Sequence, residues 1–171
     1  IEILVHGYRS NSHRDMAIYI LRAQKQKHNA LVIDQRAGGL SEGNVITFGI
    51  KERYDVLDWA NYLAKRFPDS KIILSGISMG TATVLMATGL DLPKNVWYVI
   101  ADCGYSNVRS IISNVMKKLH LPAKMMFPFV KIGARLFGNF NVEETSPIDE
   151  VKKSKVPILF VHGTTDNYVP Y

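Results

Sequence analysis

Ser78 is the residue of this chain best placed for nucleophilic chemistry, because it lies in the sequence Gly-Ile-Ser-Met-Gly between a strand-like run and a helix-like run. The residues before Gly76 are apolar and β-branched, and those after Gly80 are small and suit a helix. On such a sharp turn, known as a nucleophile elbow, a serine holds its hydroxyl in the open. The glycines are needed because a Cβ at either position would collide where strand and helix pass closest. The pattern predicts a nucleophile, and the alternative is a glycine-rich turn with an incidental serine.

Other polar residues come directly after, or close behind, strand-like runs. They are His6, Asp34, Asp102, His162 and Asp166. Because ligands bind at the carboxyl ends of the strands in an open parallel sheet, we expect these residues to gather near Ser78. Carboxylates and imidazoles are the groups that most often move or hold protons during catalysis.

The elements that must position these residues predict an α/β fold. Strands are expected at residues 1–5, 30–33, 71–75, 96–101 and 156–161. Helical spacing is present in two sets, Ala17, Ile20 and Leu21 after a capping Asn11 or Ser12, and Val56, Ala60, Leu63 and Phe67 before Pro68. A third helix is expected from Ser78 to about Gly89. Continuous apolar strands separated by amphipathic helices predict a doubly wound, mainly parallel sheet with helices on both faces.

The composition predicts one soluble domain over residues 1–171. The chain is 47% hydrophobic and 21% charged, and no apolar run approaches the roughly 20 residues of a membrane span. The formal charge is +6, but its lysines and arginines look scattered apart from Lys117-Lys118 and the run at 152–155. Neither cluster is interleaved with aromatic residues, so they predict solvated faces and no nucleic-acid partner. The single cysteine, Cys103, excludes an internal disulfide and fits a cytoplasmic location.

Residues 104–142 interrupt the alternation of strands and helices. The core of this segment, Leu121 to Phe137, is apolar but contains Pro122, Pro128 and Gly133. We expect one or two helices laid over the strand ends. Two interpretations stay open: a crossover helix with a long lead-in, or a cap-like insertion that walls a substrate pocket. A membrane-surface segment is less favoured, because the basic residues do not form a clean polar face in the sequence pattern.

The chain resembles the α/β-hydrolase superfamily, in particular compact bacterial serine hydrolases of the serine-aminopeptidase-like or esterase-like kind. The matching segments are His6-Gly7-Tyr8, Asp34 to Gly43, Gly76 to Gly80 and His162 to Pro170, in the order of that superfamily. The second segment departs from the commoner Arg-Gly-His-Gly form, since it reads Arg-Ala-Gly-Gly from Arg36. The resemblance implies a single, partial α/β-hydrolase domain, an internal piece without the first strands and the last histidine segment.

The resemblance also implies roles for particular residues. Ser78 would be the nucleophile, and the backbone N–H groups of Tyr8 and Met79 would form the oxyanion hole. Asp166 would orient a histidine and stabilise its imidazolium, with Asp102 as the rival acid. The superfamily order is serine, acid, histidine. No histidine follows Asp166, so we expect the base beyond Tyr171.

The histidines within the chain are not expected to serve as the base. His6 and His162 match structural His-Gly loops, and His13, His28 and His120 lie on or near predicted helices. Without a base a serine is a weak nucleophile, so this chain by itself is expected to be inactive.

These residues together predict a serine hydrolase that cleaves an ester, thioester or small amide through an acyl-Ser78 intermediate. The expected partner is a small acyl substrate. No cofactor or metal is expected, because the sequence lacks paired cysteines, His-Glu-x-x-His and phosphate-binding glycine motifs. Membrane contact from this segment is not favoured, although a longer parent could carry an N-terminal anchor. The alternative is a non-catalytic relative that uses the same pocket for binding or interaction.

Overall fold

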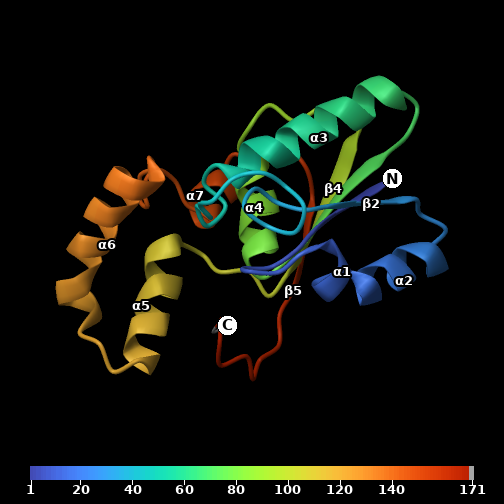
Figure 1. The fold of residues 1–171 in the computed structure, drawn as a ribbon. Helices are drawn as coiled ribbons and strands as arrows, with labels where there is room; N and C mark the ends of the chain where they lie inside the picture. The colour runs from blue at the N-terminus through green and yellow to red at the C-terminus, as the bar shows by residue number, and fades with distance from the viewer. Residues whose placement is uncertain (170–171) are drawn as a thin grey trace.

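The computed structural model describes residues 1–169 and has a five-stranded parallel sheet at its centre (Figure 1). The strands are β1 (Glu2–Val5), β2 (Ala30–Ile33), β3 (Ile72–Ile77), β4 (Val96–Asp102) and β5 (Ile158–Val161). Their order across the sheet is β2-β1-β3-β4-β5, with every neighbouring pair parallel. The predicted doubly wound α/β fold is confirmed.

The helices lie on both sides of this sheet. They are α1 (Ser12–Asp15), α2 (Ala17–Lys25), α3 (Glu52–Arg66), α4 (Met79–Ala87), α5 (Val108–Lys118), α6 (Ala123–Gly138) and α7 (Pro147–Val151). One core cluster joins the sheet to α3 and α4. A second cluster joins α4 to α5 and α6, which lie beside the sheet as a pair (Figure 1). Among residues 1–169, no helix has the length and apolar character that crossing a bilayer requires.

Two predicted helix faces need correction. In the first helix, Leu21 is exposed, and the buried residues are Met16 and Ala23. Of the other predicted residues of this face, Ala17 is exposed and Ile20 is half-buried, so the face that the spacing predicted is not the buried one. In α3, Val56, Ala60 and Leu63 are buried as expected, but Phe67 lies beyond the last helical residue and is exposed.

Residues 104–142 form two helices, α5 and α6, as one of the expected arrangements. The first of them lies outside the apolar core at 121–137 that the sequence pattern singled out. Pro128 lies inside α6 and on its exposed side, so the helix continues through it. Asn107 begins α5, because its side-chain oxygen accepts a hydrogen bond from the Ser110 N–H.

Candidate active site

The turn at Ser78 is a tight junction between β3 and α4. Ser78 has φ 54° and ψ −115°, a backbone conformation that residues other than glycine rarely adopt. A Cβ at Gly76 would overlap the backbone of Gly80, and a Cβ at Gly80 would lie 2.6 Å from the His6 carbonyl oxygen and closer still to that of Val5. Both glycines are therefore required by packing. The strain holds Ser78 away from the regular paths of strand and helix.

The loop after β1 lies against this turn. A Cβ at Gly7 would be 3.6 Å from the Ser78 Cβ, so the two backbones approach closely. Tyr8 follows, and Met79 begins α4 on the other side. Within residues 1–169, the backbone N–H groups of Tyr8 and Met79 donate no hydrogen bond to the protein. The first N–H groups of a helix lack intrahelical acceptors, so this site leaves amide donors available to a ligand.

His6 fixes the course of the loop after β1. Its Nε2 accepts a hydrogen bond of 3.0 Å from the Gln35 N–H, so Nδ1 carries the proton and donates to the Gly7 carbonyl at 2.8 Å. The Gln35 side chain donates in turn to the His6 carbonyl. His6 is only 2% exposed, and its ring has structural partners on both nitrogens.

Ser78 lies in the wall of a pocket of about 360 Å³. The lining is apolar and aromatic apart from the serine and tyrosine hydroxyls. It comprises Tyr8, Phe48, Ser78, Met79, Tyr105, Ile111, Ile112, Val115, Met116, Leu119, Leu121, Val130 and Tyr168. An apolar pocket with a few polar groups at one point is the usual form of a small-molecule site.

One wall of this pocket is a pair of stacked rings from separate loops. The rings of Tyr8 and Phe48 are 5.5 Å apart and nearly parallel. Phe48 has a positive φ of 56°, and buried Glu52 stabilises its loop by accepting hydrogen bonds from the N–H groups of Thr47 and Gly49. The hydroxyl of Tyr105 donates to the Phe48 carbonyl at 2.9 Å. Burial raises the pKa of the Tyr105 hydroxyl, which therefore stays protonated as a donor.

Another part of the lining comes from α5, which lies within the 104–142 segment but outside the apolar core at 121–137 that the sequence pattern singled out. The pocket-facing residues of α5 and the following turn are Ile111, Ile112, Val115, Met116 and Leu119. This i, i+1, i+4, i+5, i+8 spacing marks one helix face and could have been recognised in the sequence. The segment expected to wall the pocket, 121–137, contributes only Leu121 and Val130.

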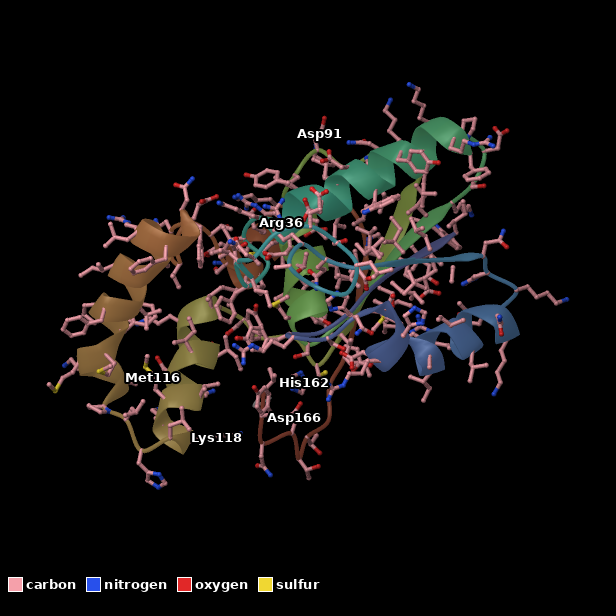
Figure 2. All side chains as sticks on the ribbon, in the orientation of Figure 1. Arg36, Asp91, Met116, Lys118, His162 and Asp166 are labelled. Atoms are coloured by element: carbon pink, nitrogen blue, oxygen red, sulfur yellow. The ribbon has the colours of Figure 1, made fainter. Side chains whose placement is uncertain are left out.

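Asp166 lies in the turn that follows β5, close to His162 (Figure 2). Its Oδ1 accepts hydrogen bonds from the N–H groups of Val169 and Tyr168, at 2.9 and 2.8 Å. These hydrogen bonds lower the pKa of the Asp166 carboxyl, so it is ionised at neutral pH. Lys118 of α5 reaches over the Tyr168 ring, with its Nζ 4.7 Å from the ring centre. Pro170, the last residue of the fourth matching segment, lies outside the described residues.

Asp102, the rival acid, has a different partner. Its Oδ2 accepts a hydrogen bond of 2.6 Å from the Tyr19 hydroxyl on α2. Burial, together with this bond, raises the pKa of that hydroxyl. The Asp102 carbonyl accepts from the Ser78 N–H at 2.9 Å, so the residue supports the turn through its backbone as well. Next to it, burial raises the pKa of the Cys103 thiol, which disfavours a reactive thiolate.

Asp34 and Arg36 hold loops at the edge of the site. The Asp34 carboxylate accepts from the N–H groups of Ser12 and Leu40, and these hydrogen bonds outweigh burial and lower its pKa. Arg36 forms a two-pronged ion pair with Asp55 on α3, at 2.7 and 2.5 Å. The loop that departs from the superfamily pattern is therefore tied to α3, and neither side chain lines the Ser78 pocket.

The remaining histidines do not line the pocket either. His13 and His120 are exposed, and His28 lies 3.4 Å from the Glu2 carboxylate, beside the start of β1. The Nε2 of His162 contacts the Val169 carbonyl at 2.8 Å and is 3.9 Å from Asp166 Oδ2. No histidine is among the residues that line the Ser78 pocket within the described chain.

Two curated proteins are similar to this chain over most of its length. Protein YqkD of Bacillus subtilis, which is described as uncharacterized, is 26% identical over 177 residues, covering 98% of this chain and 55% of that protein. Protein bem46 of Schizosaccharomyces pombe is 26% identical over 145 residues, covering 83% of this chain and 43% of that protein. The chain thus spans about half the length of the curated relatives it matches.

Solved structures share the fold. The Pyrococcus furiosus esterase Pf2001 superposes with a TM-score of 0.73 at 23% identity, covering 99% of this chain and 63% of that one. Est1E of Butyrivibrio proteoclasticus, solved with ferulic acid, gives 0.67 at 20% identity, covering 99% and 71%. At the level of families, the sequence pattern of the prolyl oligopeptidase family matches residues 47–171. Since this match covers most of the chain, the protein belongs to the prolyl oligopeptidase family, within the α/β-hydrolase superfamily.

Proposed function

We propose that this chain carries the nucleophile of a serine hydrolase that cleaves an ester, thioester or small amide. The observation that carries the proposal is the strained turn at Ser78, which places a serine in the wall of an apolar pocket. The Ser78 hydroxyl attacks the acyl carbonyl and passes its proton to a base. The tetrahedral intermediate then expels an alcohol, thiol or amine that takes up this proton, and water hydrolyses the acyl-serine.

The oxyanion of this intermediate would bind to the N–H groups of Tyr8 and Met79. Each belongs to a backbone fixed by packing, one in the loop held by His6 and the other at the start of α4. Neither donates a hydrogen bond to the protein in residues 1–169, so both can meet the developing charge. Removal of one such donor costs roughly 3–4 kcal/mol of transition-state stabilisation in enzymes of this kind. The positive end of the α4 dipole would add to this effect.

Asp166 is proposed as the acid of the triad. Its carboxylate is ionised because two backbone N–H groups stabilise the charge, and it occupies a turn after the fifth strand. The proposed base is a histidine that packs beside Asp166 and is none of the five in this chain. Without that base the 171 residues alone are expected to react slowly.

The proposed substrate has an apolar or aromatic acyl group. The pocket presents mainly aliphatic side chains from α5, and its polar side-chain groups are the hydroxyls of Ser78 and three tyrosines. The similarity to esterases favours an ester as the bond that is cleaved, whereas the match to the prolyl oligopeptidase family favours a peptide-like amide. Rates on p-nitrophenyl esters of graded chain length, compared with aminoacyl anilides, would separate the two leaving groups.

The direct test is labelling of the protein, in its full natural length, with a fluorophosphonate probe. We expect labelling that is lost in Ser78→Ala and kept in Ser113→Ala, a control serine on α5. Equal labelling of wild type and Ser78→Ala would overturn the proposal. Absence of labelling, together with binding of acyl ligands in the pocket, would support the non-catalytic alternative instead.

A further inference from the structure

The α5–α6 pair carries an apolar surface that no other part of residues 1–169 covers. Residues at positions i, i+4, i+7 and i+11 of α6 form one row along the helix. This outer row consists of Met125, Phe129, Ile132 and Leu136. Their exposed fractions range from 54% for Ile132 to 73% for Leu136. Surfaces of this kind usually mark a site of contact with a membrane or a protein.

The inner face of α6 is already occupied. Phe127 is buried, and Val130 and Ala134 pack with it against the cluster that joins α4, α5 and α6. The helix therefore has two apolar faces, of which only one packs against the protein. The outer row is not needed for the fold that the structure shows.

The positive charge of the protein is concentrated in the same helices. The chain has 21 lysines and arginines against 15 aspartates and glutamates. Residues 104–142 contain six of the former and none of the latter, so the rest of the chain carries fifteen of each. The whole formal excess of +6 thus lies in this segment, although short runs of the sequence make the cations look scattered.

Three of these cations form a row beside the outer row. Lys124, Lys131 and Arg135 each precede a member of the outer row by one residue, so they lie about 100° around the helix from it. Long basic side chains in that position can lie along an apolar surface and keep their charged ends at its margin. This is the arrangement of helices that lie flat in a membrane interface.

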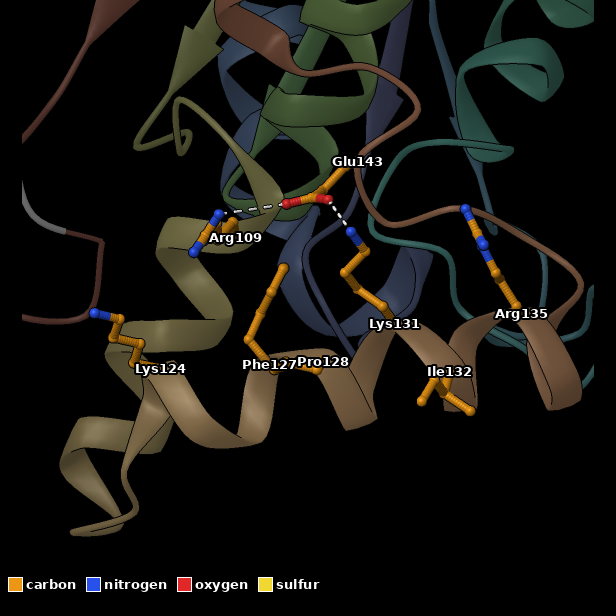
Figure 3. Close-up of a pocket in the computed structure, with 8 residues that line it drawn as sticks. All are labelled: Arg109, Lys124, Phe127, Pro128, Lys131, Ile132, Arg135 and Glu143. Carbon is orange, nitrogen blue, oxygen red and sulfur yellow. Dashed lines mark hydrogen bonds and ion pairs between the residues drawn. The ribbon is translucent and has the colours of Figure 1, made fainter.

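A cavity of about 400 Å³ lies along the cationic row (Figure 3). It is lined by Arg109, Lys124, Phe127, Pro128, Lys131, Ile132, Arg135 and Glu143. Glu143 pairs with Arg109 at 3.5 Å and with Lys131. Within residues 1–169, Lys124 and Arg135 form no ion pair, so the cavity keeps two cations for an anionic group.

We propose that the outer row of α6 and its cationic row dock the protein on the surface of an anionic phospholipid bilayer. The outer row would enter the boundary between headgroups and acyl chains, while the cations bind headgroup phosphates, one of them in the cavity. At 16 residues, α6 is about 24 Å long and lies along the surface rather than across it. The occupant is an anionic bilayer because the apolar row and the unbalanced cations occur on one helix, and a neutral partner would satisfy only the first.

The Ser78 pocket extends to the turn between α5 and α6. Leu119 and Leu121 line that pocket, and both are exposed in the turn between α5 and α6. Part of the pocket lining therefore lies in the turn that leads into α6. An apolar acyl substrate could reach the pocket from the bilayer, although docking itself does not depend on the proposed hydrolase activity.

The test is co-sedimentation of the full chain with vesicles of phosphatidylcholine alone or with 30% phosphatidylserine. We expect binding to the anionic vesicles that weakens as salt is raised, and little binding to neutral ones. Lys124→Gln/Arg135→Gln should lower the partition coefficient roughly 30-fold, from about fivefold for each cation. Phe129→Ser/Leu136→Ser should lower it about tenfold or more, since the apolar contact is lost.

Matched controls are available elsewhere on the surface. Lys25→Gln/Lys65→Gln removes the same charge from α2 and α3, and Ile18→Ser/Leu21→Ser removes exposed apolar side chains from α2. Equal losses in test and control pairs, equal binding to both vesicle types, or no vesicle binding would each overturn the proposal. A dimer in sedimentation velocity that Phe129→Ser/Leu136→Ser dissolves, without vesicle binding, would assign the surface to a second copy.

A second measurement does not depend on how the double variants fold. Phe129→Trp places a fluorophore in the outer row, and Ile18→Trp places one on α2 as the control. We expect lipids with brominated acyl chains to quench the first and leave the second unchanged, beyond the signal of the two native tryptophans. Quenching that is equal in both variants would contradict the proposed orientation.

Discussion

The sheet with α3 and α4 differs from the α5–α6 pair in how its apolar residues are buried and in its balance of charges. In the first region the central strands β1 and β3 bury almost all their residues, and all nine residues of α4 are buried. In the second region an amphipathic helix buries one apolar face and exposes another. Outside 104–142 the chain carries as many acidic as basic residues, whereas residues 104–142, which contain α5 and α6, carry only basic ones.

The same residue types therefore have different roles in the two regions. A glycine in the sheet region allows two backbones to meet, whereas Gly133 in α6 has no atom within 4 Å of the place a Cβ would occupy. An arginine in the sheet region is buried among carboxylates, whereas Arg135 in α6 is exposed. Packing determines the residues of the first region, and contact with the surroundings explains those of the second. Paired substitutions, one in each region, test this difference.

The largest expected contrast is between Gly80→Ala and Gly133→Ala. At Gly80 the new Cβ would overlap the Val5 carbonyl oxygen, and backbone at the end of a central strand cannot yield. We expect a loss of at least about 3 kcal/mol in the free energy of unfolding, above the usual range for overpacking. Gly133→Ala should be neutral or stabilising by up to about 1 kcal/mol. Urea denaturation of both variants measures this, and equal stability would refute the contrast.

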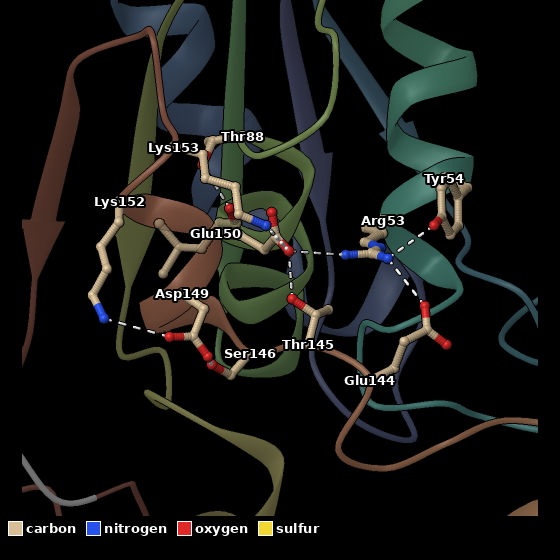
Figure 4. A network of polar contacts seen from close by, with 11 residues as sticks. Arg53, Tyr54, Thr88, Glu144, Thr145, Ser146, Asp149, Glu150, Lys152 and Lys153 are labelled. Carbon is tan, nitrogen blue, oxygen red and sulfur yellow. Dashed lines mark hydrogen bonds and ion pairs between the residues drawn. The ribbon is translucent and has the colours of Figure 1, made fainter.

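A smaller contrast is expected between Arg53→Met and Arg135→Met. Arg53 is buried and lies between Glu150, at 3.4 Å, and Glu144, at 3.1 Å (Figure 4). Its loss leaves the buried Glu150 without this partner, although Lys153 still contacts that carboxylate at 2.9 Å. We therefore expect Arg53→Met to lower the free energy of unfolding by about 3 kcal/mol, the lower end of the range for broken buried ion pairs.

Arg135→Met should change stability by less than about 0.5 kcal/mol, because the side chain is exposed and unpaired within the described residues. Thermal unfolding and urea denaturation should both show Arg53→Met to be the less stable of the two variants. A loss of several kcal/mol in Arg135→Met would show that the α6 surface contributes to the fold, against the difference drawn between the regions.

The two regions also differ in how far the sequence predicts them. The strands could be predicted because short apolar runs such as 72–74 and 158–161 are typical of strands in a parallel sheet, although the second of these is largely exposed at the edge of the sheet. Ser78, Tyr8 and Met79 come together for a related reason, since all of them follow the carboxyl ends of neighbouring strands. Phe48 and Tyr105 were missed because they reach the pocket on loops, whose paths depend on contacts such as that of Glu52.

The direction of α6 could not be predicted, because both of its faces are apolar. Phe127 and Val130 on one face are as hydrophobic as Phe129 and Ile132 on the other, so periodicity cannot say which is buried. The cluster that α6 packs against, which includes residues of α4, α5 and the loop at 46–50, decides it. This is why the segment expected to line the pocket mostly faces outward.

Tyr19→Phe probes the support of the sheet region at Asp102. The Tyr19 hydroxyl donates to Asp102 Oδ2 at 2.6 Å, and hydrogen bonds to charged groups contribute about 1.5–3 kcal/mol. Burial, then the bond to Asp102, raises the pKa of this hydroxyl in the folded protein. The folded state therefore holds a proton that the unfolded state releases above about pH 10, and this contribution falls as pH rises beyond that value.

Tyr62→Phe on α3 is the matched control, because its side chain is 55% exposed. Urea denaturation at pH 7 should show a lower free energy of unfolding for Tyr19→Phe than for Tyr62→Phe. Between pH 9 and 11 the difference in stability between wild type and Tyr19→Phe should shrink, whereas that for Tyr62→Phe should stay small. Identical stability of Tyr19→Phe and Tyr62→Phe at pH 7 would show that the contact with Asp102 does not contribute to stability.

The smallest effect is expected at Asp166, where the two regions meet. Asp166 follows a strand of the sheet, and Lys118 of α5 lies over the neighbouring Tyr168 ring. An asparagine could still accept the two backbone hydrogen bonds but would lose the charge, so Asp166→Asn should cost about 1 kcal/mol at pH 7. Because the folded pKa of Asp166 is lowered, its contribution is complete above the unfolded pKa of about 3.9.

That contribution should disappear as pH falls through the lowered folded pKa, so wild type and Asp166→Asn should converge in stability under acid. Urea denaturation from pH 7 downwards checks this, and a difference that persists unchanged in acid would contradict a role for the charge. Raised salt separates the contributions further. Salt should weaken the attraction between Asp166 and Lys118 on α5 and leave the two hydrogen bonds within the turn. The part of the stability difference between wild type and Asp166→Asn that salt removes therefore measures how strongly the two regions are coupled.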